Sequence, residues 1–570
     1  MSDDPLPGLA RGLTHYGDAD FARYFRRSMA CSMGYSAALL ARPVVGIATT
    51  ASGFNNCHRG VPALVEAVKR GVLAAGGLPL EFPTISLGEP FLSPTSLYLR
   101  NLMAMDTEEM IRAQPMDAVV LVGGCDKTVP AQWMGAISAG RPAIGLVTGP
   151  MLSARWHGER LGACTDCRRF WADYRAGRID AAAIAEIEGS LATTEGTCAV
   201  MGTASTMAAL CEGLGLILPG TAAIPAVHAD RLRAAEATGA AAIALARAGS
   251  GPADILTEPA LENALRLLLA LGGSTNAVLH LAAMAGRAGL RLDLRRLDAL
   301  SESTPVLVDC KPTGPFYMED LFAAGGIGAV LRELRPLLHL DARGVTGETL
   351  GERLTGTGGY VDRAVIRPLA EPLQPAGGLV ALFGNLAPRG AILKRAAADP
   401  ALFEREGRAV VFSSLADLAA RIDDPALDVT PEDFLVLKNA GPASAAAMPE
   451  AGYLPIPRKL AARGVKDMVR ISDARMSGTA FGTVVLHVTP DAAAGGPLAL
   501  AETGDRIRLS VRERSLDLLV PEATLAIRRA SLPPPPEPPA RGYARLYARE
   551  ILQADQGCDF AFLRPPATAM

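Results

Sequence analysis

The sequence has little that would attach the chain to a membrane or to a nucleic acid. Only 5% of its 570 residues are aromatic, and the formal net charge is −3, so no bulk cationic field attracts nucleic acid or anionic lipid. Ala, Leu and Gly spread along the chain produce the mean hydropathy of +0.21, and no apolar run reaches about 18 residues. The acidic start lacks the apolar core of a signal peptide. We therefore expect a cytoplasmic protein with neither membrane nor nucleic-acid partners.

A disulfide framework is also lacking. The nine cysteines are odd in number and mostly widely spaced, in a chain whose 49% hydrophobic and 20% charged residues are typical of a globular protein with a large core. Most of them are expected to be packing residues. The cysteines outside polar loops fall in this class, and they are Cys31, Cys211, Cys310 and Cys558. Cys164 and Cys167 form a single C-x-x-C without a second pair, which favours a structural or substrate-side role over metal binding.

The first 150 residues contain alternating strand and helix patterns. The predicted strands are 43–49, 78–86, 118–122 and 143–148, and the predicted helices between them are 61–75, 95–114 and 129–139. This alternation implies right-handed crossovers and a mostly parallel sheet. The segment 179–340 is rich in Ala and Leu and is predicted to be mostly helical. The fold class is therefore α/β.

A second region follows a Pro/Gly-rich stretch at 371–378, which predicts a linker. Short strand-like segments with few long helices then predict a β-rich, barrel-like domain. We place an N-terminal α/β domain at 1–372 and the C-terminal domain at 373–570. A polyproline spacer at 533–539 precedes a helix and loop that should dock on the body.

Reactive side chains follow the first three predicted strands. They are Cys57 in SGFNNCHRG, Glu89 in SLGEP, and Cys125, Asp126 and Lys127 in GGCDKT. Because ligands bind beyond the carboxyl ends of strands in open α/β sheets, we expect two cysteines, two carboxylates and a lysine on one edge.

A third cysteine, Cys198, lies in TEGTCAVMGTAST, before a helical run at 203–214. The three cysteines are 68 and 73 residues apart, too far for a zinc ribbon or a ferredoxin motif, but each could end a different element of one site. Thiolates select iron–sulfur clusters, zinc or copper(I), whereas carboxylates prefer magnesium or calcium. The sequence thus predicts two different metal centres side by side. Three cysteines suit a [2Fe–2S] or a [4Fe–4S] cluster.

With these motifs in hand, the sequence resembles the dihydroxy-acid and sugar-acid dehydratase family over nearly its whole length. The shared motifs include SGFNNCHRG, EFPTISLGE, GGCDKT, TEGTCAVMGTASTM, GGSTNAVLHL and SDARMSGTAFGTVVLHV. The resemblance implies an N-terminal α/β domain, a C-terminal β-barrel domain, assembly as homodimers or homotetramers, and an iron–sulfur cluster beside Mg²⁺.

The resemblance also implies roles for single residues. Cys57, Cys125 and Cys198 would hold a [2Fe–2S] cluster, and Ser477 would be the catalytic base that takes the C2 proton. The Mg²⁺ ligands would be Glu89, Asp126, Glu450 and a carbamylated Lys127. An ammonium beside Mg²⁺ would repel it, whereas a carbamate supplies an anionic oxygen. The implied reaction is a β-elimination of water that yields a 2-keto-3-deoxy acid.

The residues within several motifs favour the sugar-acid branch of this family over the amino-acid branch. The stretch RLGACTDCRRFWADYRAG (160–177) resembles pentonate dehydratases, so the expected substrate is an aldonate such as L-arabinonate or D-xylonate. His58, Arg59, Thr165 and Asp166 are candidate contacts for its polar tail. The alternatives are a dihydroxy-acid dehydratase of branched-chain amino-acid biosynthesis, a non-catalytic iron–sulfur electron carrier and a structural zinc protein.

Overall fold

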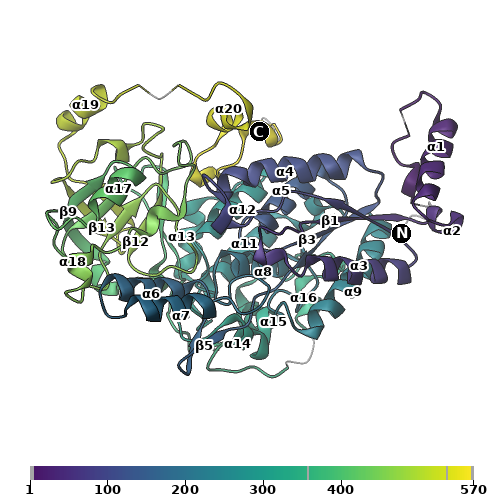
Figure 1. Ribbon diagram of the computed structural model, residues 1–570, viewed down its shortest axis with the longest axis horizontal. Coiled ribbons are helices and arrows are strands. Elements are labelled where there is room, and N and C mark those ends of the chain that lie inside the picture. Colours follow the sequence, from purple (N-terminus) through teal and green to yellow (C-terminus); the bar gives the residue numbers. More distant parts are fainter. Residues whose placement is uncertain (1–5, 14, 356–358, 535–536, 567–570) are drawn as a thin grey trace.

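Two sheets at opposite ends of the molecule organise the chain. The computed structural model describes residues 6–13, 15–355, 359–534 and 537–566. In Figure 1 the N-terminal sheet lies on the right, the β-rich C-terminal region lies on the left, and helices fill the space between them. None of the helices within these described ranges combines the length and the apolar character needed to cross a membrane.

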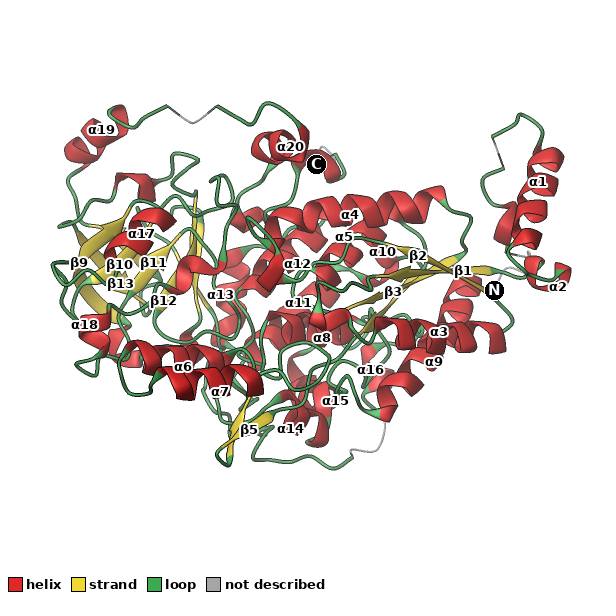
Figure 2. Cartoon of the chain, in the orientation of Figure 1, coloured by secondary structure: helices red, strands yellow, loops and turns green. Residues whose placement is uncertain are grey.

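The N-terminal sheet is parallel, as predicted. Its order is β2-β1-β3-β4, with β1 at Val44–Thr49, β2 at Leu78–Pro83, β3 at Ala118–Gly123 and β4 at Ala143–Val147. All the residues of β3 and β4 are buried. Such burial arises because helices cover both faces: Figure 2 shows α4 (Ser96–Ala113) and α5 (Thr128–Ala139) on one side, and α3 (Val61–Ala74) and α9 (Ala229–Ala248) on the other.

Two glycines let α3 and α9 touch through their backbones. A methyl group on Gly71 would lie 1.8 Å from the carbonyl oxygen of Glu236, and one on Gly239 would lie 2.2 Å from that of Val68. Because such distances are far inside van der Waals contact, alanine at either position would push the helices apart.

Helices dominate the rest of this domain, which confirms the prediction for 179–340. They are α1 (Ala19–Ser32), α2 (Ala37–Leu40), α6 (Thr165–Arg175), α7 (Ala181–Ser190), α8 (Thr203–Leu214), α10 (Pro252–Ile255), α11 (Glu258–Ala270), α12 (Asn276–Arg287), α13 (Leu294–Glu302), α14 (Met318–Ala323), α15 (Gly326–Leu334) and α16 (Leu350–Arg353), with a hairpin of β5 (Ala154–Trp156) and β6 (Glu159–Leu161).

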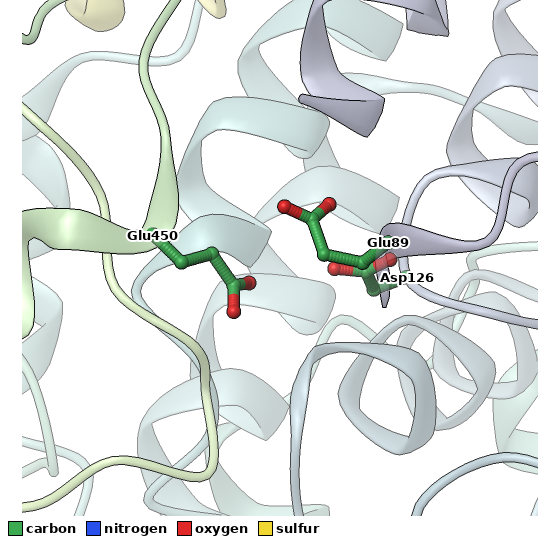
Figure 3. A group of neighbouring side chains, drawn as sticks. All are labelled: Glu89, Asp126 and Glu450. Carbon is green, nitrogen blue, oxygen red and sulfur yellow. The ribbon is translucent and has the colours of Figure 1, made fainter. Parts of the chain in front are cut away.

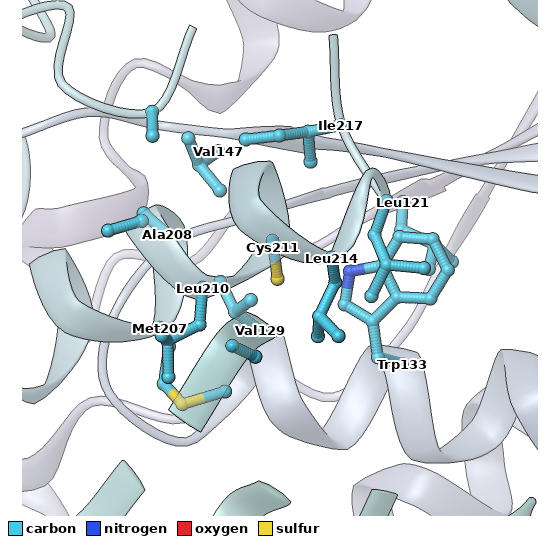
Figure 4. Packing of buried hydrophobic residues seen from close by; sticks show 14 of the residues in the cluster. Leu121, Val129, Trp133, Val147, Met207, Ala208, Leu210, Cys211, Leu214 and Ile217 are labelled. Atoms are coloured by element: carbon cyan, nitrogen blue, oxygen red, sulfur yellow. The ribbon is translucent and has the colours of Figure 1, made fainter. Parts of the chain in front are cut away.

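The core of this domain lies between the sheet and these helices. Figure 4 shows Cys211 of α8 among apolar neighbours that include Val129 and Leu214. Cys211, Cys310 and Cys558 are buried, as expected of packing residues, whereas the prediction was wrong for Cys31, which is exposed.

The C-terminal sheet is mixed and nearly closes into the predicted barrel. Its order is β14-β13-β9-β10-β11-β12-β8-β7, and its strands are β7 (Val380–Leu382), β8 (Gly390–Leu393), β9 (Glu404–Phe412), β10 (Phe434–Leu437), β11 (Arg470–Ser472), β12 (Val484–Thr489), β13 (Arg506–Ser510) and β14 (Ser515–Leu518). Phe383, next to β7, forms an isolated bridge with Ser515 of β14. This bridge brings the two edge strands of the sheet together.

Four helices accompany this sheet, and the last docks on the N-terminal domain as expected. They are α17 (Leu415–Arg421), α18 (Arg458–Ala461), α19 (Glu522–Ala530) and α20 (Gly542–Glu550). The Tyr543 hydroxyl of α20 donates to the Tyr98 carbonyl oxygen at 2.6 Å. Arg100 donates to the carbonyl oxygens of Gly557 and Cys558, each at 2.7 Å. The predicted spacer at 533–539 includes residues 535–536, which lie outside the described residues.

Candidate active site

A pocket of about 1360 Å³ gathers the predicted site residues of both domains. Its lining includes Cys57, Glu89, Cys125, Asp126 and Cys198 from the N-terminal domain, and Glu450 and Ser477 from the C-terminal domain. The remaining predicted ligand, Lys127, is fully buried next to the lining carboxylates. Residues from six separate segments therefore meet in one place.

Three carboxylates form one wall of this pocket. Glu89 begins a short 3₁₀ turn after β2, Asp126 follows β3, and Glu450 begins a 3₁₀ turn of the C-terminal domain. Each offers an oxygen, and these three atoms lie within 4.8 Å of one another. Figure 3 shows Glu450 opposite Glu89 and Asp126. Six-coordinate Mg²⁺, with ligands at about 2.1 Å, places its oxygens about 3 to 4 Å apart, so this group fits the ion.

Lys127 and Arg475 neutralise part of this negative charge. The Lys127 Nζ lies 3.6 Å from Glu89 Oε2 and 4.0 Å from Glu450 Oε1, and it forms an ion pair with Asp126. The fully buried Arg475 guanidinium donates to Glu89 Oε1 at 2.7 Å and to Glu450 Oε1 at 2.6 Å. We call Glu89, Asp126, Lys127, Glu450 and Arg475 the acidic half of the site.

Burial and charge act in opposite directions on these groups. Burial alone would raise the pKa of Glu89, but the charges of Arg475 and Lys127 outweigh it and hold that pKa well below its usual range. The pKa of Glu450 is raised, because its burial and the neighbouring Glu89 outweigh the attraction of Arg475. Burial also opposes the charge of Arg475, yet the carboxylates of Glu89 and Glu450 raise its pKa further. Arg475 therefore stays charged between the two glutamates.

Arg475 is the functional residue that sequence reasoning missed. It lies two residues before Ser477 in the motif SDARMSGT, so its position next to a candidate catalytic residue was the available signal. Nothing in the local sequence indicates that this arginine, unlike most, is fully buried.

Three cysteines form a second wall, which we call the thiol half of the site. Cys57 lies in the 3₁₀ turn Asn56–His58 after β1, Cys125 follows β3, and Cys198 precedes α8. A hydrogen bond to the Cys57 thiol, together with burial, raises the pKa of Cys125. A hydrogen bond with the Cys164 thiol and burial raise the pKa of Cys198, and Cys57 and Cys125 are close enough to contribute to this rise. Sulfur atoms this close to one another suit a soft metal cluster rather than a hard cation.

Consecutive residues after β3 belong to the two halves of the site: Cys125 to the thiol half and Asp126 to the acidic half. Cys125 has a φ of 64°, a left-handed conformation that a non-glycine residue seldom adopts. The Cys125 thiol donates to the Asp126 carboxylate, with Sγ and Oδ1 3.4 Å apart. The two predicted metal sites are therefore in direct contact.

Ser477 lies in the loop between β11 and β12, in the same pocket. Its hydroxyl is 2.8 Å from the Thr479 hydroxyl, and the two form a hydrogen bond. Lys394 donates to the carbonyl oxygen of Gly478 at 3.3 Å, and burial lowers the pKa of Lys394 to about 7. The serine loop is thus held by a hydroxyl on one side and by a buried amine on the other.

The four predicted contacts for a substrate tail do not line the pocket, so those predictions were wrong. His58 is buried, where its ring bonds to Ser86 Oγ at 2.7 Å and to the backbone of Gly124, and burial lowers its pKa to about 4. Arg59 is exposed.

The other two, Thr165 and Asp166, support neighbouring loops. The Thr165 hydroxyl donates to the Thr479 carbonyl oxygen at 3.0 Å, and the buried Asp166 accepts hydrogen bonds from Gly162 and Lys311. The charged residues that line the pocket away from the predicted metal ligands are instead Arg168, Arg169, Asp173, Arg175, Arg178, Glu188 and Lys466. Most of them lie on or near α6, within the RLGACTDCRRFWADYRAG stretch or just beyond it.

Comparison with family models assigns both parts of the chain to one family. Residues 42–353 match the N-terminal domain described as dihydroxy-acid/6-phosphogluconate dehydratase, and residues 364–558 match the C-terminal domain of the same description.

Curated relatives match along nearly the whole chain. An L-arabonate dehydratase of Azospirillum brasilense is 47% identical over 92% of this chain and 91% of its own. A 6-deoxy-6-sulfo-D-gluconate dehydratase of Pseudomonas putida is 44% identical, with the same coverage of 92% and 91%. A dihydroxy-acid dehydratase of Syntrophobacter fumaroxidans is 38% identical over 93% of this chain and 96% of its own.

Proposed function

Because the chain belongs to the dihydroxy-acid/6-phosphogluconate dehydratase family, we propose that it removes water from an aldonate, such as L-arabinonate or D-xylonate, to give a 2-keto-3-deoxy acid. Membership makes the chain an enzyme, a hydro-lyase. The electron-carrier and structural-zinc alternatives are therefore wrong.

One observation carries the proposal: a single pocket holds three carboxylates, three cysteines and a serine drawn from both domains. A dehydration next to a carboxylate needs a base for the C2 proton, positive charge for the carboxylate that gains electron density, and help for the departing hydroxyl. The serine, the acidic half and the thiol half match these three needs in turn.

The residues that would hold the cofactors follow from this division. We assign a [2Fe–2S] cluster to Cys57, Cys125 and Cys198, and we assign Mg²⁺ to Glu89, Asp126, Glu450 and a carbamylated Lys127. When bound, these groups supply Lewis acids for the departing hydroxyl and for the substrate carboxylate. Carbamylation suits Lys127, because it turns a buried ammonium into an anionic ligand at the centre of the carboxylates.

The chain's own residues perform the proton transfer. Ser477 Oγ acts as an alkoxide, takes the proton from C2 of the substrate and becomes a hydroxyl. The Thr479 hydroxyl, 2.8 Å away, donates a hydrogen bond that stabilises the alkoxide before the transfer. Arg475 fixes Glu89 and Glu450 across the domain boundary, so that the acidic half keeps its shape while charge moves on the substrate.

An aldonate is favoured over a branched apolar dihydroxy acid for two reasons. The relatives named for aldonates are 44–47% identical to this chain, whereas the dihydroxy-acid dehydratase is 38% identical. The pocket also carries seven charged side chains beyond the predicted metal ligands. A hydroxylated tail can hydrogen-bond to such side chains, whereas an apolar tail cannot.

We also propose a cytoplasmic homodimer or homotetramer. Helix α1 and the residue that follows it expose large apolar side chains, including Tyr24 at 69% and Met33 at 70%. An exposed apolar face of this kind marks a protein-interaction surface. Light scattering of the purified protein would give the number of subunits.

The substrate class is tested by measuring 2-keto acid formation. The protein would be purified without oxygen and assayed with Mg²⁺ on L-arabinonate, D-xylonate, D-fuconate, D-galactonate, D-gluconate and 2,3-dihydroxyisovalerate, beside a Ser477→Ala variant. We expect turnover of one or more aldonates and its loss in the variant, with iron content unchanged. Turnover of 2,3-dihydroxyisovalerate alone would instead support the amino-acid branch.

A further inference from the structure

We propose that Cys164 is a fourth thiol ligand of the iron–sulfur cluster when no substrate is bound. The proposal rests on the cluster assignment made above and extends it to a residue outside the three shared motif cysteines. Cys164 lines the same pocket as Cys57, Cys125 and Cys198.

The distance between two sulfur atoms carries this inference. The Sγ atoms of Cys164 and Cys198 are 3.4 Å apart. Two thiolates on one tetrahedral metal ion, each with a metal–sulfur bond of about 2.3 Å, lie about 3.8 Å apart. The observed separation is thus close to that of two ligands on the same iron, and small side-chain rotations cover the difference.

The four thiols also form two pairs. The Cys57 thiol is close enough to that of Cys125 to raise its pKa, and the Cys164 and Cys198 thiols form a hydrogen bond. A [2Fe–2S] cluster with four cysteine ligands takes two thiolates on each iron. The pairing in the structure therefore matches a complete ligand set, and the C-x-x-C motif needs no second motif of its own kind to complete it.

The backbone around Cys164 is fixed, so its thiol is held in place. Cys164 precedes the first residue of α6, Thr165, whose hydroxyl donates to the Thr479 carbonyl oxygen. Next to it, the buried Asp166 accepts hydrogen bonds from the Gly162 N–H at 2.8 Å and from Lys311 Nζ at 2.7 Å. Contacts with both domains therefore position Cys164 against Cys198.

The other cysteine of the motif gives a matched control. Cys167 lines the same pocket, but its thiol donates to the carbonyl oxygen of Cys164 at 2.7 Å. Replacing Cys167 removes a thiol of the same motif and the same pocket without removing the partner of Cys198.

A fourth protein ligand has a consequence for the resting enzyme. With Cys164 as a ligand, the departing substrate hydroxyl would have to replace it when substrate binds. Until then Cys164 would complete the set of protein ligands and limit the access of oxygen to the cluster. Removal of Cys164 should therefore change the cluster's spectrum and its lifetime in air before any substrate is added.

The test compares full-length wild type, Cys164→Ala and Cys167→Ala, all purified without oxygen. Iron and sulfide per chain, the electron paramagnetic resonance spectrum of the dithionite-reduced cluster and the decay of visible absorption in air would be measured. We expect Cys164→Ala to keep its iron and sulfide, to show shifted g values and to lose its absorption several-fold faster in air. Cys167→Ala should match wild type.

Identical spectra and decay rates in wild type and Cys164→Ala would overturn the proposal. If Cys164→Ala does not hold a cluster, Cys164→Ser decides, since a seryl oxygen ligand shifts the visible absorption bands and a residue that is not a ligand leaves them unchanged. Wild type without iron and sulfide would instead refute the underlying cluster assignment, whatever the role of Cys164.

Discussion

The two halves of the pocket are built in different ways. The thiol half comes entirely from the N-terminal domain, where Cys57, Cys125 and Cys198 line the same pocket. The acidic half joins the two domains: Glu89, Asp126 and Lys127 meet Glu450 and Arg475 of the C-terminal domain through buried ion pairs. One domain is thus enough to assemble the thiol half, whereas the acidic half exists only when both domains are docked.

Arg475→Met should disrupt the acidic half and leave the thiol half intact. Of the variants considered, it should lower the free energy of unfolding the most. It would leave Glu89 and Glu450 without their buried partner, and breaking such a pair costs about 3 to 5 kcal/mol. The measurement is the free energy of unfolding in urea of metal-free protein. As a control, Arg506→Met removes an exposed ion pair with Glu406 and should cost less than about 1 kcal/mol. Equal effects of the two variants would show that the ion pairs of Arg475 do not support the acidic half.

Lys394, beside the serine loop, should make stability depend on pH. Its pKa is about 7 in the folded protein, against 10.5 ordinarily, because burial disfavours the charge. Between pH 7 and 10.5 the unfolded chain therefore binds the extra proton, so this residue makes the free energy of unfolding rise with pH, by about 1.4 kcal/mol per unit at most. Below pH 7 the full penalty is present.

The variant Lys394→Met lacks that penalty. Its free energy of unfolding, relative to wild type, should be most favourable below pH 7 and should decline toward pH 10.5. Urea titrations of both proteins across this range would check the sign. A constant difference between them would mean that Lys394 keeps its ordinary pKa in the fold.

The smallest effect on activity or stability is expected at Thr479, which connects the serine loop to the segment next to Cys164. Its hydroxyl bonds to Ser477, and its carbonyl oxygen accepts a hydrogen bond from Thr165, next to Cys164. Thr479→Val removes only the hydroxyl and should lower kcat about tenfold, the worth of one hydrogen bond to a charged group, with KM little changed. Thr479→Ser should restore kcat. A valine variant with full kcat would leave Thr479 without a role in positioning Ser477.

Much of the fold could be predicted because it depends on local patterns. The four strands and three helices predicted in the first 150 residues are found within a few residues of their predicted bounds, since buried strands and amphipathic helices repeat their apolar residues with different periods. Helices α1 and α2, which precede them, were not predicted. The convergence of Cys57, Glu89 and Cys125 followed from one rule, that the carboxyl ends of parallel strands share an edge.

The features of the site that could not be predicted depend on contacts between segments that are distant in the sequence. The burial of Arg475 arises from the packing of two domains, and the contact of Cys164 with Cys198 spans 34 residues without a repeating pattern. His58 follows a strand just as Cys57 does, yet it turns inward to bond to Gly124. Sequence order alone does not tell which of two neighbouring polar residues faces the pocket.

The metal contents of two variants at adjacent positions test the division into halves most directly. Iron, sulfide and Mg²⁺ per chain would be measured in wild type, Cys125→Ala and Asp126→Asn, all purified without oxygen. We predict that Cys125→Ala loses iron and sulfide but still binds Mg²⁺, and that Asp126→Asn keeps iron and sulfide but loses Mg²⁺. Loss of both metals in both variants, or of neither in either, would contradict the account of two separate metal sites in one pocket.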